Sequence, residues 1–230
     1  MQAEALLEAI EHETGPSPRY SVLWLHGLGA DGHDFAPIVP QLVRRDWPAL
    51  RFVFPHAPVR AVTINGGARM RAWYDIRDVG FADGNGGSRA DAAGVETSVA
   101  QVEALIDNEI MRGTPTSRIF LAGFSQGGAV ALAAGVRRGE PLAGLIALST
   151  YLPTADVAVA GDGATTQPIF MAHGAQDPVV PCRAGEASAA RLRELGFGVD
   201  WHRYAMPHSV CAEEIRDLGD WMSQRLAVAH

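Results

Sequence analysis

Short, almost continuously apolar segments recur along the chain and are the strongest constraint on its fold. They cover residues 20–25, 51–54, 118–123, 142–149, 169–173 and 199–204. Most do not alternate between apolar and polar residues, which is typical of strands covered on both faces and therefore of a parallel sheet. Helical patterns separate them, at residues 88–112, 128–135, 183–195 and 210–226. The sequence thus predicts one α/β domain over residues 1–230, with a mostly parallel central sheet and helices on both faces.

Composition excludes several classes of function. The chain has 230 residues and a net charge of −7, which argues against a nucleic-acid partner. All of its basic residues are Arg, and the absence of Lys removes Schiff-base chemistry and the lysine of a phosphate-binding loop. We expect a cytoplasmic protein without stable membrane insertion, because the start of the chain lacks the pattern of a signal peptide and no apolar stretch is long enough to span a bilayer.

A nucleophile elbow is expected where the third apolar segment ends. Gly123-Phe-Ser125-Gln-Gly127 fits the pattern G-x-S-x-G, and it stands between a predicted strand and a small-residue helix. The turn is so sharp that only small residues fit two positions before and two positions after the serine. Ser125 is therefore the candidate nucleophile.

A serine nucleophile needs a base, and the base needs a carboxylate to orient it. On this architecture the chain order is Ser, acid, His, with both partners on loops after later strands. His208 follows the last predicted strand, and Asp177 follows the strand before it. The other residues of these types are weaker candidates: His173, His202 and His230 for the base, and Asp156, Asp162 and Asp200 for the acid.

The stretch after the first predicted strand permits two interpretations. Gly27, Gly29 and Gly32 fit the dinucleotide-binding pattern G-x-G-x-x-G. That pattern also needs an acidic residue at the end of the second strand, and none occurs between Asp46 and Asp75. The alternative is an oxyanion hole, in which glycines turn backbone amides toward the site. The donors would be the backbone N–H groups of Leu28 and Gln126, with their side chains incidental to that role.

Several segments together resemble the carboxylesterase and acyl-protein thioesterase family of α/β-hydrolases, also called the phospholipase/carboxylesterase family. The matching segments are L25-H-G-L-G, F54-P-H-A-P-V-R60, T63-I-N-G-G67, R71-A-W-Y-D75, G123-F-S-Q-G-G-A129, H173-G-A-Q-D-P-V-V-P181 and M206-P-H-S209. By this resemblance the family's triad falls on Ser125, Asp177 and His208, and its oxyanion donors fall on Leu28 and Gln126. Pro207 stands where many members carry Gly.

The resemblance implies an α/β-hydrolase fold, no cofactor and often a homodimer. It implies a serine carboxylesterase, and we expect it to act on a small-molecule ester or lipid-like substrate with a short to medium acyl chain. The alternative is an acyl-protein thioesterase or lysophospholipase that acts on longer chains. A non-catalytic binding protein and a redox enzyme are rivals from other classes.

Other residues are assigned from their place in the sequence. Trp73 and Tyr74 are candidates for the wall of the acyl pocket, ahead of Phe81, Tyr151 and Leu152. Asp75 is expected to be structural. Cys182 and Cys211 are expected to be ordinary buried thiols. Residues 78–87 are expected to form a surface loop or a mobile flap.

Overall fold

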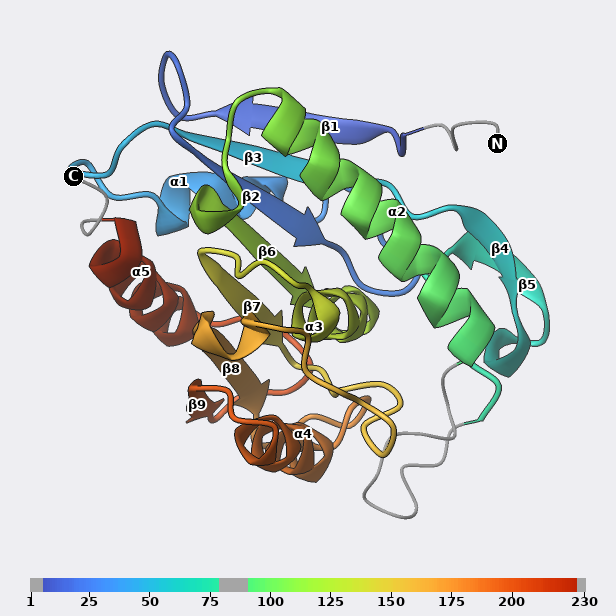
Figure 1. Cartoon of the computed structure of the whole chain (residues 1–230). Coiled ribbons are helices and arrows are strands. Elements are labelled where there is room, and N and C mark those ends of the chain that lie inside the picture. The colour runs from blue at the N-terminus through green and yellow to red at the C-terminus, as the bar shows by residue number, and fades with distance from the viewer. Residues whose placement is uncertain (1–5, 79–90, 227–230) are drawn as a thin grey trace.

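A seven-stranded sheet forms the centre of the computed structural model, which describes residues 6–78 and 91–226. The strands lie in the order β1–β3–β2–β6–β7–β8–β9, and every neighbouring pair is parallel except β1–β3 (Figure 1). Their bounds are β1 Ala9–Glu13, β2 Tyr20–Leu25, β3 Leu50–Pro55, β6 Ile119–Phe124, β7 Gly144–Leu148, β8 Ile169–Gly174 and β9 Val199–Tyr204. All the expected strands are present, and β1 is an additional antiparallel edge strand.

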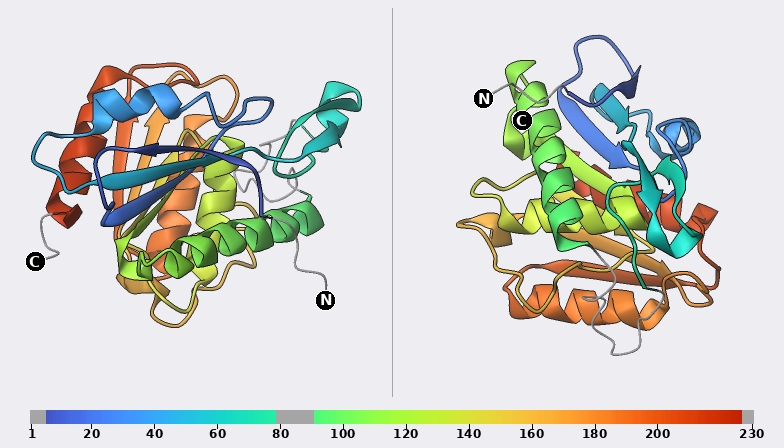
Figure 2. Two further views of the ribbon diagram at one scale, coloured as in Figure 1. Left: turned by 90° about the horizontal axis from the view of Figure 1, so that it is seen from above. Right: turned by 90° about the vertical axis from the view of Figure 1, so that its right-hand side faces the viewer.

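The sheet is covered on both faces, as the continuous apolar segments predicted. Every residue of β2 is buried. Leu23 and Leu25 join one hydrophobic cluster, whereas Val22 and Trp24 join another, because successive side chains of a strand point to opposite faces. The helices are α1 Val39–Leu42, α2 Ala92–Met111, α3 Gln126–Arg137, α4 Cys182–Glu194 and α5 Ala212–Leu226. Helices α2, α3 and α4 contribute to the first cluster, and α1 and α5 contribute to the second (Figure 2).

A small hairpin stands apart from the main sheet. Strands β4 (Val59–Val62) and β5 (Ala68–Arg71) form a separate two-stranded antiparallel sheet that projects from the rest of the fold (Figures 1 and 2). Asp75 ties the hairpin to the domain, because its carboxylate accepts hydrogen bonds from Thr63 N at 2.7 Å and Thr63 Oγ1 at 2.6 Å. The expectation that Asp75 is structural agrees with these contacts.

Helix α2 begins at Ala92, after Asp91, which makes no side-chain capping bond and instead pairs with Arg77 at 3.1 Å. The start of the helical pattern expected at residue 88 lies outside the described residues. The segment 78–87 that was expected to be a loop or flap also lies outside them, apart from Asp78.

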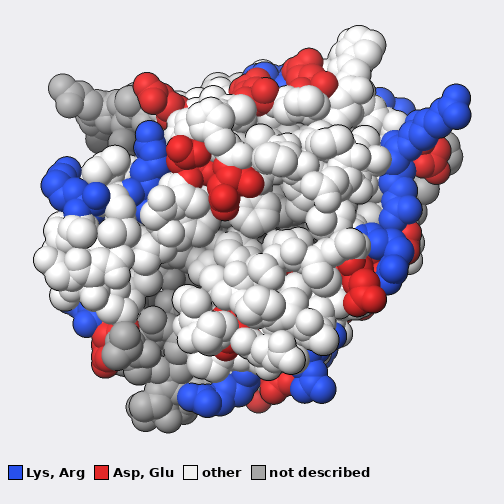
Figure 3. Space-filling view, turned by 180° about the vertical axis from the view of Figure 1, so that it is seen from behind, with Lys and Arg blue, Asp and Glu red and all other residues white. Residues whose placement is uncertain are grey.

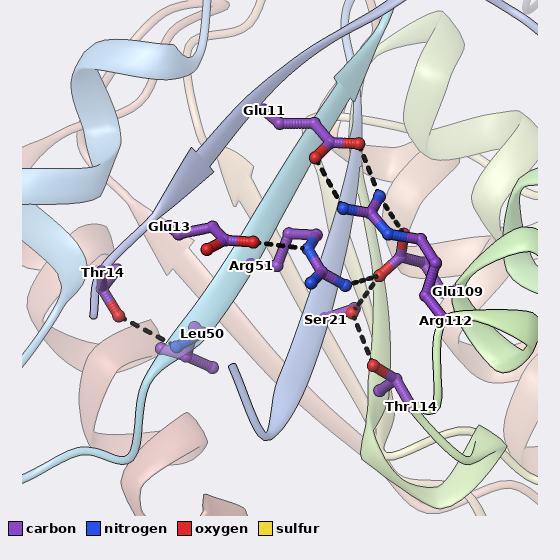
Figure 4. A network of polar contacts seen from close by, with 9 residues as sticks. All are labelled: Glu11, Glu13, Thr14, Ser21, Leu50, Arg51, Glu109, Arg112 and Thr114. Carbon is purple, nitrogen blue, oxygen red and sulfur yellow. Dashed lines mark hydrogen bonds and ion pairs between the residues drawn. The ribbon is translucent and has the colours of Figure 1, made fainter. Parts of the chain in front are cut away.

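A buried polar network joins the end of α2 to the first strands (Figure 4). At its centre is Glu109, which is 1% exposed and accepts hydrogen bonds from Ser21 of β2, from Arg51 of β3 at 3.0 Å and from Arg112 at 2.8 Å. Arg112 also reaches Glu11 of β1 at 2.6 Å. The buried carboxylate is stabilised by its partners, so this network fixes the edge of the sheet against α2.

The net charge of −7 is not gathered into one patch on the face shown in Figure 3. Acidic and basic side chains lie mainly around the margin of this face, and its middle is largely uncharged. Among the helices of residues 6–78 and 91–226, none is long and apolar enough to cross a membrane.

Helix α5 carries a buried acid in its first turn. Glu214 is fully buried, and neither of its carboxyl oxygens has a hydrogen-bond partner among the described residues. Burial raises the pKa of Glu214 from 4.5 to about 8. The folded protein therefore keeps a proton that the unfolded chain releases, so this group's contribution to stability falls as pH rises from 4.5 to about 8.

We expect Glu214→Gln, which mimics the protonated acid, to remove this pH dependence. Between pH 5 and 8 the free energy of unfolding of the wild type should fall relative to the variant by about 1 kcal/mol per pH unit. Urea unfolding at a series of pH values measures the difference. Glu213→Gln, a change at the exposed neighbouring position, is the control and should keep the wild-type slope. Parallel curves for the wild type and Glu214→Gln would contradict the assignment.

Candidate active site

The predicted elbow joins β6 to α3. Ser125 has φ 53° and ψ −119°, a backbone conformation that is rare for a residue with a side chain. A Cβ on Gly123 would lie 2.4 Å from the backbone of Gly127, and a Cβ on Gly127 would lie 2.4 Å from Leu25 O. Both positions therefore require glycine, as the sharpness of the turn predicted.

The strained backbone of Ser125 is held by its neighbours. Its N–H donates to Leu148 O at the end of β7 at 2.9 Å. Its carbonyl accepts from Thr150 Oγ1 at 2.6 Å and from Ala129 N, in the first turn of α3, at 3.1 Å. Such conformations persist only where the surrounding structure over-determines them. The contacts place the Ser125 side chain at the carboxyl edge of the sheet, where active sites of open α/β sheets form.

Asp177 and His208 meet at the same edge, although 31 positions separate them in the chain. His208 Nδ1 lies 2.6 Å from Asp177 Oδ2. The other carboxylate oxygen accepts hydrogen bonds from the backbone N–H groups of Val179 and Val180, each at 2.8 Å. With Nδ1 donating to the carboxylate, the imidazole presents Nε2 as its free acceptor.

Several donors keep the Asp177 carboxylate ionised. Burial by itself raises the pKa of this group, but hydrogen bonds from His173, His208 and the amide of Val180 outweigh that effect and hold the pKa well below its ordinary value. The side chain is therefore a permanent negative charge behind His208 at any pH near neutrality.

The His208 ring also lies beside the elbow, with its centroid 4.7 Å from that of Phe124, the residue before Ser125. Gly174 at the end of β8 allows this placement, because a Cβ there would lie 2.3 Å from Pro207 O and 2.4 Å from Met206 O. The loop before His208 thus packs directly on the backbone of β8, with proline at position 207.

The other histidines have different environments. His173 is fully buried, and its Nε2 lies 2.8 Å from Val180 O and 3.4 Å from Asp177 Oδ2. His202 stacks on Phe170, with ring centroids 4.7 Å apart. His230 lies outside the described residues. Of the rival acids, Asp200 accepts a hydrogen bond from Trp221 Nε1, and Asp156 and Asp162 are exposed.

The glycine-rich loop after β2 lies next to the nucleophile. A Cβ on Gly27 would stand 3.6 Å from Ser125 Cβ, and Gly29 has φ 78°, which favours glycine. Gly32 packs against β3, since a Cβ there would lie 2.3 Å from Phe54 O. The next α-helix is only the four residues of α1. The long helix whose N-terminus would hold a pyrophosphate does not follow this loop, which agrees with rejecting the dinucleotide interpretation.

A cavity of about 190 Å³ opens beside Ser125. Its lining residues are Leu28, Ile64, Asn65, Tyr74, Ile76, Ser125, Gln126, Tyr151, Val179 and Val180. Tyr74 lines this cavity, and Tyr151 joins it through hydroxyl oxygens 2.9 Å apart. Trp73 does not line the cavity: its indole is buried in the core, and Nε1 donates to His26 O at 2.9 Å. The two neighbours thus take different environments, Tyr74 at the cavity and Trp73 in the core.

Two residues organise the cavity in ways that sequence reasoning missed. The Gln126 side chain accepts from Trp73 N at 2.9 Å and donates to Tyr74 O at 2.7 Å, so it is not incidental to the structure. His26 accepts from Ala57 N at 3.0 Å through Nε2, and burial lowers its pKa. Its position directly before the glycine loop was the available signal.

Three further expectations concern neighbouring residues. Cys182 and Cys211 are half-buried rather than buried, because each lies at or just before the start of a surface helix, α4 or α5. Leu152 belongs to the core and Phe81 lies outside the described residues.

Comparisons with known proteins agree with this architecture. A family model described as Phospholipase/Carboxylesterase matches residues 8–226. Acyl-protein thioesterase 1 of Neurospora crassa is 40% identical over 215 residues, which cover 90% of this chain and 86% of that protein. Carboxylesterase SOBER1 of Arabidopsis thaliana is 35% identical over 211 residues, covering 90% of this chain and 91% of that protein.

Solved structures show the same fold. The crystal structure of Arabidopsis thaliana SOBER1 matches with a TM-score of 0.84 and 35% identity, and the match covers 90% of this chain and 99% of that chain. The crystal structure of Zea mays acyl-protein thioesterase 2 matches with a TM-score of 0.78 and 26% identity, covering 95% of this chain and 100% of that chain. The chain therefore belongs to the phospholipase/carboxylesterase family and is a serine hydrolase with the α/β-hydrolase fold.

Proposed function

We propose that the protein is a carboxylesterase that hydrolyses esters of short to medium acyl chains through a triad of Ser125, His208 and Asp177. The observation that carries the proposal is the 2.6 Å contact between His208 Nδ1 and Asp177 Oδ2, at the sheet edge where the elbow places Ser125. This contact fixes the imidazole tautomer whose Nε2 can accept a proton from a serine hydroxyl.

In the first half of the reaction, Ser125 Oγ attacks the acyl carbonyl while His208 Nε2 takes its proton. The resulting oxyanion is stabilised by the backbone N–H groups of Leu28 and Gln126, and Gln126 is well placed because the first amides of a helix have no intrahelical acceptor. The protonated His208, held by the Asp177 carboxylate, then gives its proton to the leaving alcohol, which departs and leaves an acyl-enzyme on Ser125.

In the second half, His208 takes a proton from water as the water attacks the acyl-enzyme. Collapse of the second tetrahedral intermediate returns the proton to Ser125 Oγ and releases the carboxylic acid. The apolar side chains that line the cavity beside Ser125, including Ile64 and Val180, suit an uncharged acyl chain.

The second candidate function is that of an acyl-protein thioesterase or lysophospholipase with longer acyl chains. The relatives named acyl-protein thioesterase 1, which include the one that is 40% identical, favour it. The same triad serves a thioester equally well, because the thiolate is an even better leaving group than an alkoxide. The two candidates differ in acyl length rather than in mechanism.

We expect Ser125→Ala to lower kcat for 4-nitrophenyl butyrate by about a million-fold, because the nucleophile and the group that His208 deprotonates are lost together. Stopped spectrophotometric assays at high enzyme concentration measure the residual rate. Ser117→Ala, a change in the short 3₁₀ turn before β6, is a matched control that should keep full activity. Full activity in Ser125→Ala would refute the proposed nucleophile.

We expect Asp177→Asn to lower kcat by about ten-thousand-fold, because an amide can donate to His208 and stabilise the wrong tautomer while keeping the size of the side chain. The same ester assay measures the loss, and the melting temperature shows whether the variant is folded. Asp162, an exposed residue that was a weaker candidate for the acid, supplies the control: Asp162→Asn should leave kcat unchanged. A folded Asp177→Asn enzyme with wild-type kcat would exclude Asp177 from the triad.

The two candidate functions are separated by comparing acyl length across leaving groups. We expect kcat/KM for butyryl esters to exceed that for a palmitoylated peptide thioester by at least about tenfold, because the cavity beside Ser125 is too small for a long chain. A butyryl thioester is the control for the leaving group and should be hydrolysed readily. The opposite preference, for the palmitoyl substrate, would favour the acyl-protein thioesterase.

A further inference from the structure

We propose that the side chains of Tyr74 and Tyr151, joined by a hydrogen bond between their hydroxyl groups, form the floor of the acyl pocket and limit the enzyme to acyl chains of about four to six carbons. The inference rests on the proposed function, because it assumes that the acyl chain enters the cavity beside Ser125. It adds the residues that determine how long that chain can be.

The exposure of the lining residues distinguishes the mouth of the cavity from its inner end. Val179 is 53% exposed and Asn65 is also exposed, so these residues mark the mouth. Tyr74 is fully buried and Tyr151 is 4% exposed, so they mark the inner end. Ser125 is half-buried and lines the same cavity. An acyl chain on Ser125 that turns inward therefore meets the tyrosines.

The volume of the cavity determines how long an acyl chain it can hold. An apolar cavity of about 150 Å³ binds benzene, which has six carbons, so a cavity of about 190 Å³ takes an acyl chain of about four to six carbons. No acidic or basic side chain is among the described residues that line the cavity, which favours an uncharged chain over one ending in a carboxylate.

The floor is held in place from three sides. The side chain of Gln126, on α3, donates a hydrogen bond to Tyr74 O. Gly94 of α2 lies directly against Tyr74, since a Cβ at position 94 would stand 3.1 Å from Tyr74 Cβ. Tyr151 packs with Val180 and Ala184 in a small cluster at the start of α4. A longer chain could not simply push either ring aside.

A hydrogen bond between the two hydroxyl groups holds the rings of the floor against each other. The Tyr74 and Tyr151 oxygens are 2.9 Å apart and buried. A chain that extended past the floor would have to displace one of the two rings from its packing. Each added methylene within the cavity therefore increases kcat/KM, and the first methylene beyond it decreases kcat/KM.

The experiment compares 4-nitrophenyl esters of two to twelve carbons, with kcat/KM for the eight-carbon ester divided by that for the four-carbon ester as the readout. The ratio does not depend on the fraction of active enzyme, so partial misfolding of a variant cannot mimic the result. In the wild type we expect a ratio of about 0.1 or less. In Tyr151→Ala, which removes the ring from the floor, the ratio should rise at least about tenfold.

Tyr151→Phe is the matched variant, because it removes the hydroxyl and keeps the ring. Its ratio should stay within about threefold of the wild type, since the volume is unchanged. A wild-type ratio near or above one, or a ratio in Tyr151→Ala equal to that of the wild type, would overturn the inference. Full turnover of these esters by Ser125→Ala is a different outcome: it would remove the proposed nucleophile and, with it, the reason to read this cavity as an acyl pocket.

Discussion

The close approach of β6 and α3 is the contact on which the rest of the site depends. Only glycine fits at positions 123 and 127, where any side chain would run into backbone atoms less than 2.5 Å away. The backbone between them is forced into the positive φ of Ser125, and the hydrogen bond that Ser125 N–H donates to Leu148 O of the neighbouring strand β7 holds it there. Strain at one residue is thus maintained by the packing of two complete elements, which is how folded proteins keep a reactive side chain exposed.

Polar contacts extend this rigidity to the segments around the cavity. The Gln126 side chain fixes the backbone of Trp73 and Tyr74, and the Trp73 indole fixes the carbonyl of His26. His26 in turn fixes Ala57, just before the hairpin of β4 and β5. Because each of these groups is buried and has a partner, the loops around Ser125 are held relative to the elbow rather than free to rearrange.

The electrostatics of the site follow from the same arrangement. The Asp177 carboxylate accepts two backbone amides on one oxygen and His208 on the other, and His173 lies behind it. A buried carboxylate without these donors would take up a proton more readily and would lose its hold on the imidazole. The loop at 177–180 therefore supplies both the charge and the groups that stabilise it.

The sequence alone determined the features that depend on neighbouring residues. Continuous apolar segments located the strands of the parallel sheet, and the glycines around Ser125 located the elbow, because both follow from local sterics and burial. Asp177 and His208 were located by their place after successive strands. Their mutual contact is a property of the folded chain. His208 pairs with the Asp177 carboxylate, whereas His173 Nε2 lies against a backbone carbonyl and His202 stacks on an aromatic ring.

Only the tertiary structure decided the features that depend on contacts between distant segments. Strand β1 has a largely exposed pattern and carries no strong signal of its own, so its antiparallel pairing with β3 emerged only on folding. Which of Trp73 and Tyr74 faces the cavity depends on a single step along the backbone, set by the Gln126 side chain more than 50 positions away. The sequence shows which chemical groups the chain contains and how far apart they are along it. The orientation of each side chain depends on packing between segments that can be any distance apart in the sequence.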